Sequence, residues 1–171
     1  MAALLHERRI AFAVVGAAAM AVHGVSRATR DLDVLAVDTR CLATKTWVAL
    51  QEHGVAVTVR AGDADDPLGG VVRLVEVGES PVDVVVGKAN WQARVLARAT
   101  PRTIGDAVVP VAAPADLVLL KLYAGGPQDA WDVTQLLDAG DRPKLVAEVE
   151  AGLAALPDES RRLWSRVVDP R

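Results

Sequence analysis

The spacing of apolar and polar residues changes once along this chain, near residue 113. Before that point, short apolar runs bounded by turn residues predict β-strands interspersed with a few helices. After it, apolar residues recur every three or four positions, which predicts helices only. We therefore predict an α+β fold, with a mixed β-sheet and flanking helices over residues 1–113. A C-terminal helical tail, residues 114–171, is expected to pack on that core.

Glycine and proline residues divide the two patterns into elements. The strands expected are 10–15, 31–37, 55–61, 71–77, 82–86 and 107–112. The helices expected are 17–22, 40–53, 90–99, 115–124, 128–139, 143–156 and 158–168. Gly16 permits a tight turn between the first strand and the first helix, and Gly24 is placed to end that helix.

Composition narrows the class of protein. Half the residues are hydrophobic (51%) but only 4% are aromatic, so the core must consist mainly of Val, Leu and Ala. A net charge of −3 argues against a globally basic nucleic-acid binder, although a local basic cleft stays compatible with it. The single cysteine, Cys41, excludes an intramolecular disulfide and a cysteine-based zinc cluster, which fits the reducing cytoplasm.

The N-terminal region allows two interpretations. Basic residues at 8–9 followed by an apolar run over 10–22 imitate a secretory signal. However, Gly16 interrupts the run where a strand would turn into a helix, and this favours a strand, turn and helix. The run is too short to span a bilayer, so we expect no membrane association.

Acidic residues stand inside two of the apolar strands. Asp31 and Asp33 are two positions apart, so their side chains project from the same face of a strand. An apolar strand has little reason to carry this pair unless a cation or a very polar ligand binds there. Asp83 is a lone acid within another apolar strand, and Gly16 opens a helix whose N-terminal N–H groups suit phosphate. Together they predict a site for divalent metal and phosphate.

The order of these features resembles the nucleotidyltransferase superfamily that includes DNA polymerase β. That pattern is an apolar residue with Gly-Gly or Gly-Ser, a spacer, Asp-x-Asp between apolar residues, and a later Asp within a strand. This sequence carries it as Val15-Gly16-Ala17, Asp31-Leu32-Asp33-Val34 and Val82-Asp83-Val84.

Two longer stretches look like the bacterial AbiEii-type toxin branch and its small relatives. They are HGVSRATRDLDV at residues 23–34 and ADLVLLKLYAGGPQDAWDVTQLL at 115–137. The small aminoglycoside and lincosamide nucleotidyltransferases carry a related phrase of Gly, Thr-Arg and Asp-x-Asp. The resemblance covers about residues 10–137 and implies a nucleotidyltransferase-like sheet.

The resemblance also implies a reaction, in which a nucleoside monophosphate passes from an NTP to an acceptor and pyrophosphate is released. Asp31 and Asp33 would hold two Mg²⁺ ions, and Asp83 would complete the metal site and help to deprotonate the acceptor hydroxyl. Further residues that it implies at the nucleotide are Gly16, Ala17, Arg27, Thr29, Lys121, Asp129 and Asp132. The acceptor is expected to be an RNA end, as for a toxin, and an antitoxin is an expected partner.

Alternatives stay open at three points. Ala17 stands where the superfamily usually has Ser or Gly, so an inactive binding module of the same fold is one alternative. A small-molecule acceptor of the antibiotic type is another. Lys121 lies in a nearly all-apolar helix and needs a partner. It either forms a structural pair with Asp129 or Asp132, or reaches the phosphates with one of them positioning it.

Overall fold

The computed structural model describes residues 1–169 and divides into two compact units. The first unit comprises residues 1–18 and 28–112, and the second comprises residues 19–27 and 113–169. The second unit thus includes a short segment from the N-terminal half, which the sequence pattern did not separate.

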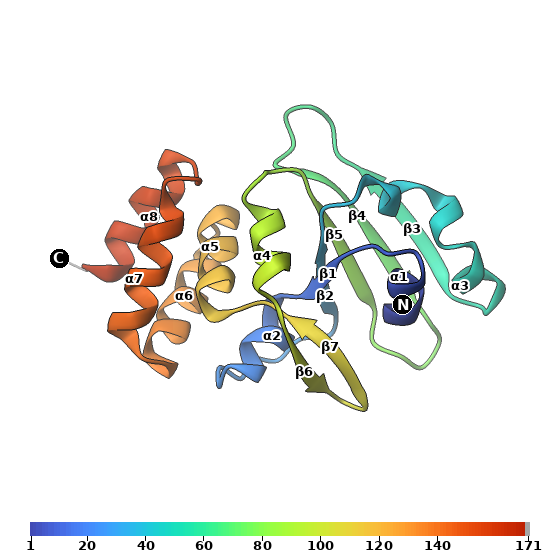
Figure 1. Ribbon diagram of the computed structural model, residues 1–171, viewed down its shortest axis with the longest axis horizontal. Helices are drawn as coiled ribbons and strands as arrows, with labels where there is room; N and C mark the ends of the chain where they lie inside the picture. Colours follow the sequence, from blue (N-terminus) through green and yellow to red (C-terminus); the bar gives the residue numbers. More distant parts are fainter. Residues whose placement is uncertain (170–171) are drawn as a thin grey trace. The chain divides into compact units, whose positions relative to one another are not determined.

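A seven-stranded mixed sheet forms the first unit, in the order β3-β4-β5-β2-β1-β7-β6 (Figure 1). The strands are β1 (Phe12–Val14), β2 (Leu32–Ala36), β3 (Ala56–Ala61), β4 (Leu68–Val75), β5 (Val82–Gly87), β6 (Thr100–Ile104) and β7 (Ala107–Val111). β2 pairs antiparallel with β1 and parallel with β5, whereas β7 runs parallel to β1. The predicted α+β fold with a mixed sheet is therefore confirmed, although β6 was not anticipated.

The helices of this unit are short. They are α1 (Ala2–Glu7), the start of α2 (Gly16–Val22), the 3₁₀ helices η1 (Thr39–Leu42) and η2 (Thr44–Thr46), α3 (Val48–Glu52) and α4 (Gln92–Arg98). α1 was not predicted from the sequence. The prediction of one helix over 40–53 is wrong, because side chains there bond to the local backbone instead of leaving it free for a helix. The Thr46 hydroxyl donates to the Arg40 carbonyl, and the Trp47 indole N–H donates to the Cys41 carbonyl.

The two faces of the sheet differ because side chains alternate along each strand. On one face, apolar side chains of β2, β4 and β5 pack with α1 and the η1–η2 segment into a hydrophobic core. Val34, Val72 and Val84 are fully buried there. The positions between them, including residues 33, 73 and 83, therefore point to the opposite face.

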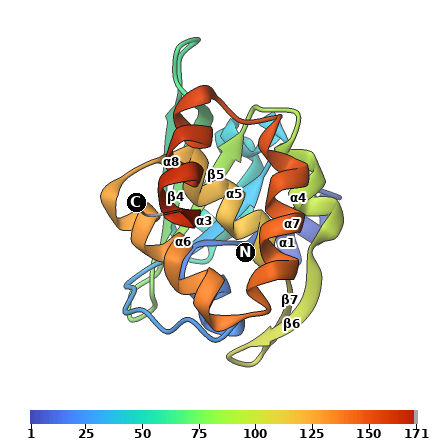
Figure 2. The ribbon, with the colours of Figure 1, turned by 90° about the vertical axis from the view of Figure 1, so that its left-hand side faces the viewer.

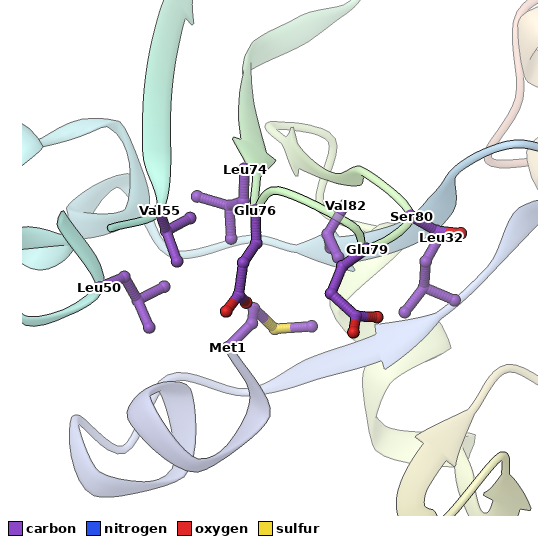
Figure 3. A pocket seen from close by; sticks show the side chains of 9 residues that line it. All are labelled: Met1, Leu32, Leu50, Val55, Leu74, Glu76, Glu79, Ser80 and Val82. Atoms are coloured by element: carbon purple, nitrogen blue, oxygen red, sulfur yellow. The ribbon is translucent and has the colours of Figure 1, made fainter. Parts of the chain in front are cut away.

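A pocket of about 430 Å³ opens at the edge of the apolar face. Its walls include Leu32, Leu74 and Val82, and the carboxylates of Glu76 and Glu79 stand beside Met1 at its rim (Figure 3). None of the residues predicted to bind nucleotide or metal is among its lining residues. The predicted nucleotide and metal site therefore lies outside this pocket.

Four consecutive helices make up most of the second unit: α5 (Pro114–Ala124), α6 (Pro127–Ala139), α7 (Arg142–Leu153) and α8 (Asp158–Val168) (Figure 2). α5 packs against each of the other three. α5 ends at Gly125, whose φ of 73° is left-handed, and Pro127 starts α6, so the two helices form a tight hairpin. No helix within residues 1–169 has the length and apolar character needed to cross a bilayer.

Candidate functional site

Three charged residues from neighbouring strands form a row across the sheet. Arg73 of β4 is in register with Asp83 of β5, and Asp83 is in register with Asp33 of β2. Neighbouring strands lie about 4.8 Å apart, so the two carboxylates are close neighbours on one face. Like charges in such a pair destabilise a sheet, and a cation nearby offsets that repulsion.

Arg73 supplies part of that positive charge. Its Nη1 atom lies 2.6 Å from Asp83 Oδ2 and 3.8 Å from Asp31 Oδ2. Arg73 was not among the residues predicted from the sequence. A signal for it exists, because Arg73 and Asp83 lie equally far from Gly78 in a hairpin of otherwise apolar strands.

Only one of the two oxygens of the Asp83 carboxylate is hydrogen-bonded to Arg73. Its Oδ2 atom accepts the hydrogen bond from Arg73. Its Oδ1 atom is buried and has no hydrogen-bond partner. A buried carboxylate oxygen without a partner is costly, so Oδ1 is suited to receive a proton or a cation from a ligand.

Gly16 lies against the Asp33 side chain at the start of α2. Its φ is 63°, and a Cβ atom built on it would overlap Asp33 Oδ2. The Val15 N–H also donates to the Asp33 carbonyl, which fixes the end of β1 beside β2. Glycine is therefore required here both by backbone conformation and by the closeness of the carboxylate. The next residue, Ala17, has a buried side chain that serves packing.

Thr29 orients Asp31 from within the loop before β2. Its hydroxyl lies 2.9 Å from the Asp31 carbonyl oxygen and 3.0 Å from Oδ1 of the same residue. In this structure Thr29 thus contacts one of the predicted metal ligands, and its role at a nucleotide stays a prediction. Asp31 itself stands just before β2 and is turned toward Arg73.

Asp33 and Asp83 have the chemistry expected of magnesium ligands, since they offer oxygen donors and one of these is an unpartnered buried atom. Within residues 1–169, however, no three His, Cys, Asp or Glu side chains are gathered closely enough to enclose a metal ion. Asp31, the third predicted ligand, instead faces Arg73. Magnesium commonly binds one or two carboxylates together with substrate phosphates, so two neighbouring aspartates fit a metal that arrives with a nucleotide.

The second unit contains the other predicted charged residues. Lys121 Nζ lies 3.0 Å from Asp129 Oδ1 and 2.8 Å from Asp132 Oδ2. Burial alone would lower the pKa of Lys121, but hydrogen bonds and charges from Asp132 and Asp129 outweigh it and leave the pKa above the ordinary lysine value. Asp129 also accepts a hydrogen bond from the Gly126 N–H. The geometry matches a structural ion pair between α5 and α6.

Arg27 belongs to the same cluster in the second unit. Its Nε atom is 3.7 Å from Asp132 Oδ1, and it is buried without a hydrogen-bond partner. Gln128 Nε2 donates to the same Asp132 oxygen at 3.2 Å. Asp132 is completely buried. Its carboxylate is surrounded by the side chains of Lys121, Arg27 and Gln128.

Comparison with known proteins defines the class of fold. No protein-family model and no curated protein matches this sequence. Among solved structures, the solution structure of the antibiotic-resistance factor ANT(2'')-Ia is similar at a TM-score of 0.57 and 15% identity, over 89% of this chain and 86% of that one. A crystal structure of ANT(2'')-Ia with adenylyl-2''-tobramycin gives a TM-score of 0.55 at 17% identity, covering 87% and 90% of the two chains.

An antigenic nucleotidyltransferase-like protein from Paracoccidioides brasiliensis is also similar, with a TM-score of 0.50 and 19% identity over 95% of this chain and 88% of the other. The fold of this chain is therefore nucleotidyltransferase-like, as the sequence motifs predicted.

Proposed function

We propose that this chain transfers a nucleoside monophosphate from an NTP to an acceptor, with release of pyrophosphate. The observation that carries the proposal is that Asp33 and Asp83 are in register on neighbouring strands. In addition, the Oδ1 atom of Asp83 is buried and has no hydrogen-bond partner. A strand pair that places two carboxylates side by side gains nothing for stability, so a ligand is the natural reason for it.

Four residues of the first unit have a role in this proposal: Gly16, Asp31, Asp33 and Asp83. Asp33 and Asp83 would hold Mg²⁺, and Asp31 would join them by turning from Arg73; the ion would neutralise the triphosphate and the developing charge. The Asp83 carboxylate accepts the proton of the acceptor hydroxyl. The acceptor oxygen then bonds to the α-phosphorus, the bond from that phosphorus to the bridging oxygen breaks, and pyrophosphate leaves. Gly16 has no side chain, and this allows the Asp33 carboxylate to lie against the start of α2.

Within the second unit, Arg27 and Lys121 are proposed to bind phosphate groups, with Asp129 and Asp132 positioning them. Arg27 supports this best, because its Nε atom is buried without a hydrogen-bond partner. Lys121 is already bound by two carboxylates, so it would have to exchange one of them for a phosphate.

Two classes of acceptor are proposed. The stretch 23–34, similar to AbiEii-type toxins, supports an RNA end as acceptor in the cytoplasm, with an antitoxin as partner. The likeness to ANT(2'')-Ia, a structure of which contains adenylyl-2''-tobramycin, favours a small molecule instead. The two are separated by which acceptor becomes labelled.

The experiment incubates the protein with each α-³²P-labelled NTP and Mg²⁺, in parallel with total tRNA and with a panel of aminoglycosides and lincosamides. We expect label on one acceptor class, and a loss of more than about a hundredfold in Asp33→Asn and Asp83→Asn. Asp65→Asn is the matched control, since it makes the same chemical change in an exposed loop of the same unit.

Equal labelling by wild type and Asp33→Asn would contradict the proposal. If the protein binds NTP with Mg²⁺ in calorimetry but labels nothing, the inactive binding module is the correct interpretation. If it binds neither NTP nor Mg²⁺, the carboxylate pair has another purpose and the proposal is wrong.

A further inference from the structure

Arg73 is a charged side chain in the carboxylate row that no sequence motif assigned. It is the positive end of the register row with Asp83 and Asp33. We propose that Arg73 is a positioning residue and resident counter-ion, which holds Asp83 by one oxygen and opposes metal binding until the nucleotide arrives. This inference rests on the function proposed above.

The positioning role follows from the two oxygens of Asp83. Arg73 Nη1 binds Oδ2 at 2.6 Å, which fixes the rotation of the carboxylate. The other oxygen, Oδ1, is left buried and unpartnered. Carboxylates that ligate metals are commonly held by a hydrogen bond to the oxygen that does not face the metal. Arg73 is placed to make that hydrogen bond in this chain.

The counter-ion role follows from charge. The guanidinium of Arg73 contacts two of the three acids of the candidate site, Asp83 at 2.6 Å and Asp31 at 3.8 Å. A guanidinium this close to Asp83 offsets part of the attraction for a divalent ion. The triphosphate brings more negative charge and thereby restores the attraction, so metal binding is coupled to nucleotide binding.

Two substitutions separate the roles. Arg73→Met removes both the charge and the hydrogen bond, while Arg73→Lys keeps the charge and loses the planar fork. The side chain of Arg73 is 45% exposed, so either variant should fold.

The matched control is Arg60→Met on β3. Arg60 is exposed and in register with Val71, so it lies on the same face of the sheet as Arg73 and belongs to the strand next to β4. Its loss changes the net charge equally without removing a contact to Asp83.

The measurement is Mn²⁺ binding to the nucleotide-free protein, followed by electron paramagnetic resonance of the free ion. We expect Arg73→Met to bind Mn²⁺ roughly five- to tenfold more tightly than wild type. Arg73→Lys and Arg60→Met should stay within about twofold of wild type. Adding a non-hydrolysable NTP should tighten Mn²⁺ binding strongly in wild type and less in Arg73→Met.

Other results overturn the inference. If Arg73→Met binds Mn²⁺ no more tightly than wild type, or if Arg60→Met tightens binding as much, Arg73 is not the counter-ion. If Arg73→Lys behaves like Arg73→Met, charge is not what opposes the metal. The proposed function fails separately: in that case Asp33→Asn leaves Mn²⁺ binding unchanged in every background, with or without NTP.

Discussion

Gly16 has a backbone conformation that favours glycine, and it also lies against Asp33, a residue of the candidate site. Its positive φ and the overlap that a Cβ atom would make with Asp33 are separate effects. We expect Gly16→Ala to cost roughly 2 kcal/mol of unfolding free energy from strain alone, plus displacement of the Asp33 carboxylate. Chemical denaturation and Mn²⁺ titration measure the two effects.

Gly54→Ala is the control for Gly16→Ala. Gly54 has a φ of 87° in the same unit, but a Cβ atom there would contact nothing within 4 Å. It should therefore show the strain without any change in metal binding. If Gly16→Ala binds Mn²⁺ as well as Gly54→Ala does, the closeness of Gly16 to Asp33 is irrelevant to the site.

Cys41 offers a pH-dependent test of the sheet core. Burial raises the pKa of its thiol to about 11, from an ordinary value of 9.0. Because the folded pKa is the higher one, Cys41 contributes stability that is complete below pH 9 and is lost as the pH rises toward 11. We expect wild type to lose on the order of 2 kcal/mol relative to Cys41→Ala over that range, measured by urea unfolding.

A thiol reagent gives the complementary result. The folded protein should leave Cys41 unmodified at pH 8, since the side chain is fully buried, and should react on unfolding. Rapid modification of the native protein, or parallel pH curves for wild type and Cys41→Ala, would disprove the burial argument.

At the residue scale, the sequence identified the acids and missed their partner. Asp31, Asp33 and Asp83 were predictable because charge inside an apolar strand is conspicuous. Arg73 is equally conspicuous in VVRLV, but its significance depends on the β4–β5 register, which the sequence did not fix. The buried, unpartnered Oδ1 of Asp83 could not be predicted from any pattern, because it depends on side-chain rotation.

At the element scale, strongly periodic segments were predicted well and locally bonded ones were not. α8 begins and ends where the pattern indicated, at Asp158 and Val168. The segment 40–53 failed because Thr46 and Trp47 bond to nearby carbonyls. β6 was missed because proline and exposed residues hide its alternation.

The hairpin of α5 and α6 makes a prediction at this same scale. If Lys121 is a structural clamp, Lys121→Met leaves Asp132 buried with less compensation and should cost about 3 kcal/mol or more of unfolding free energy. The double variant Lys121→Met with Asp132→Asn should recover much of that loss, because the buried charge is also gone. Thermal and urea unfolding measure both.

Lys144→Met is the matched control for this pair. Lys144 is 71% exposed and lies 3.9 Å from Glu148, so its loss should change stability by less than about 0.5 kcal/mol. If Lys121→Met is as stable as Lys144→Met, the clamp contributes nothing, and Lys121 is better explained as a residue kept for the phosphates.

At the scale of the whole molecule, the carboxylates of Asp33 and Asp83 repel each other and lower stability, and a bound cation should reduce that repulsion. Asp33 and Asp83 are in register on neighbouring strands, so their two negative charges lie side by side on one face of the sheet. We expect Asp33→Asn to raise the melting temperature by about 2–4 °C in chelator, as removal of roughly 1 kcal/mol of repulsion would do in a chain of this size.

With magnesium and nucleotide present, wild type should have a higher melting temperature than Asp33→Asn. With Mg²⁺ and a non-hydrolysable NTP, wild type gains stability by ligand binding and Asp33→Asn gains much less. The net charge of −3 means that any Asp→Asn change also weakens general repulsion, so Asp65→Asn, which alters net charge equally, isolates the local effect. If Asp65→Asn raises the melting temperature as much as Asp33→Asn does, the gain comes from net charge. The register pair would then carry no stored repulsion for a cation to relieve.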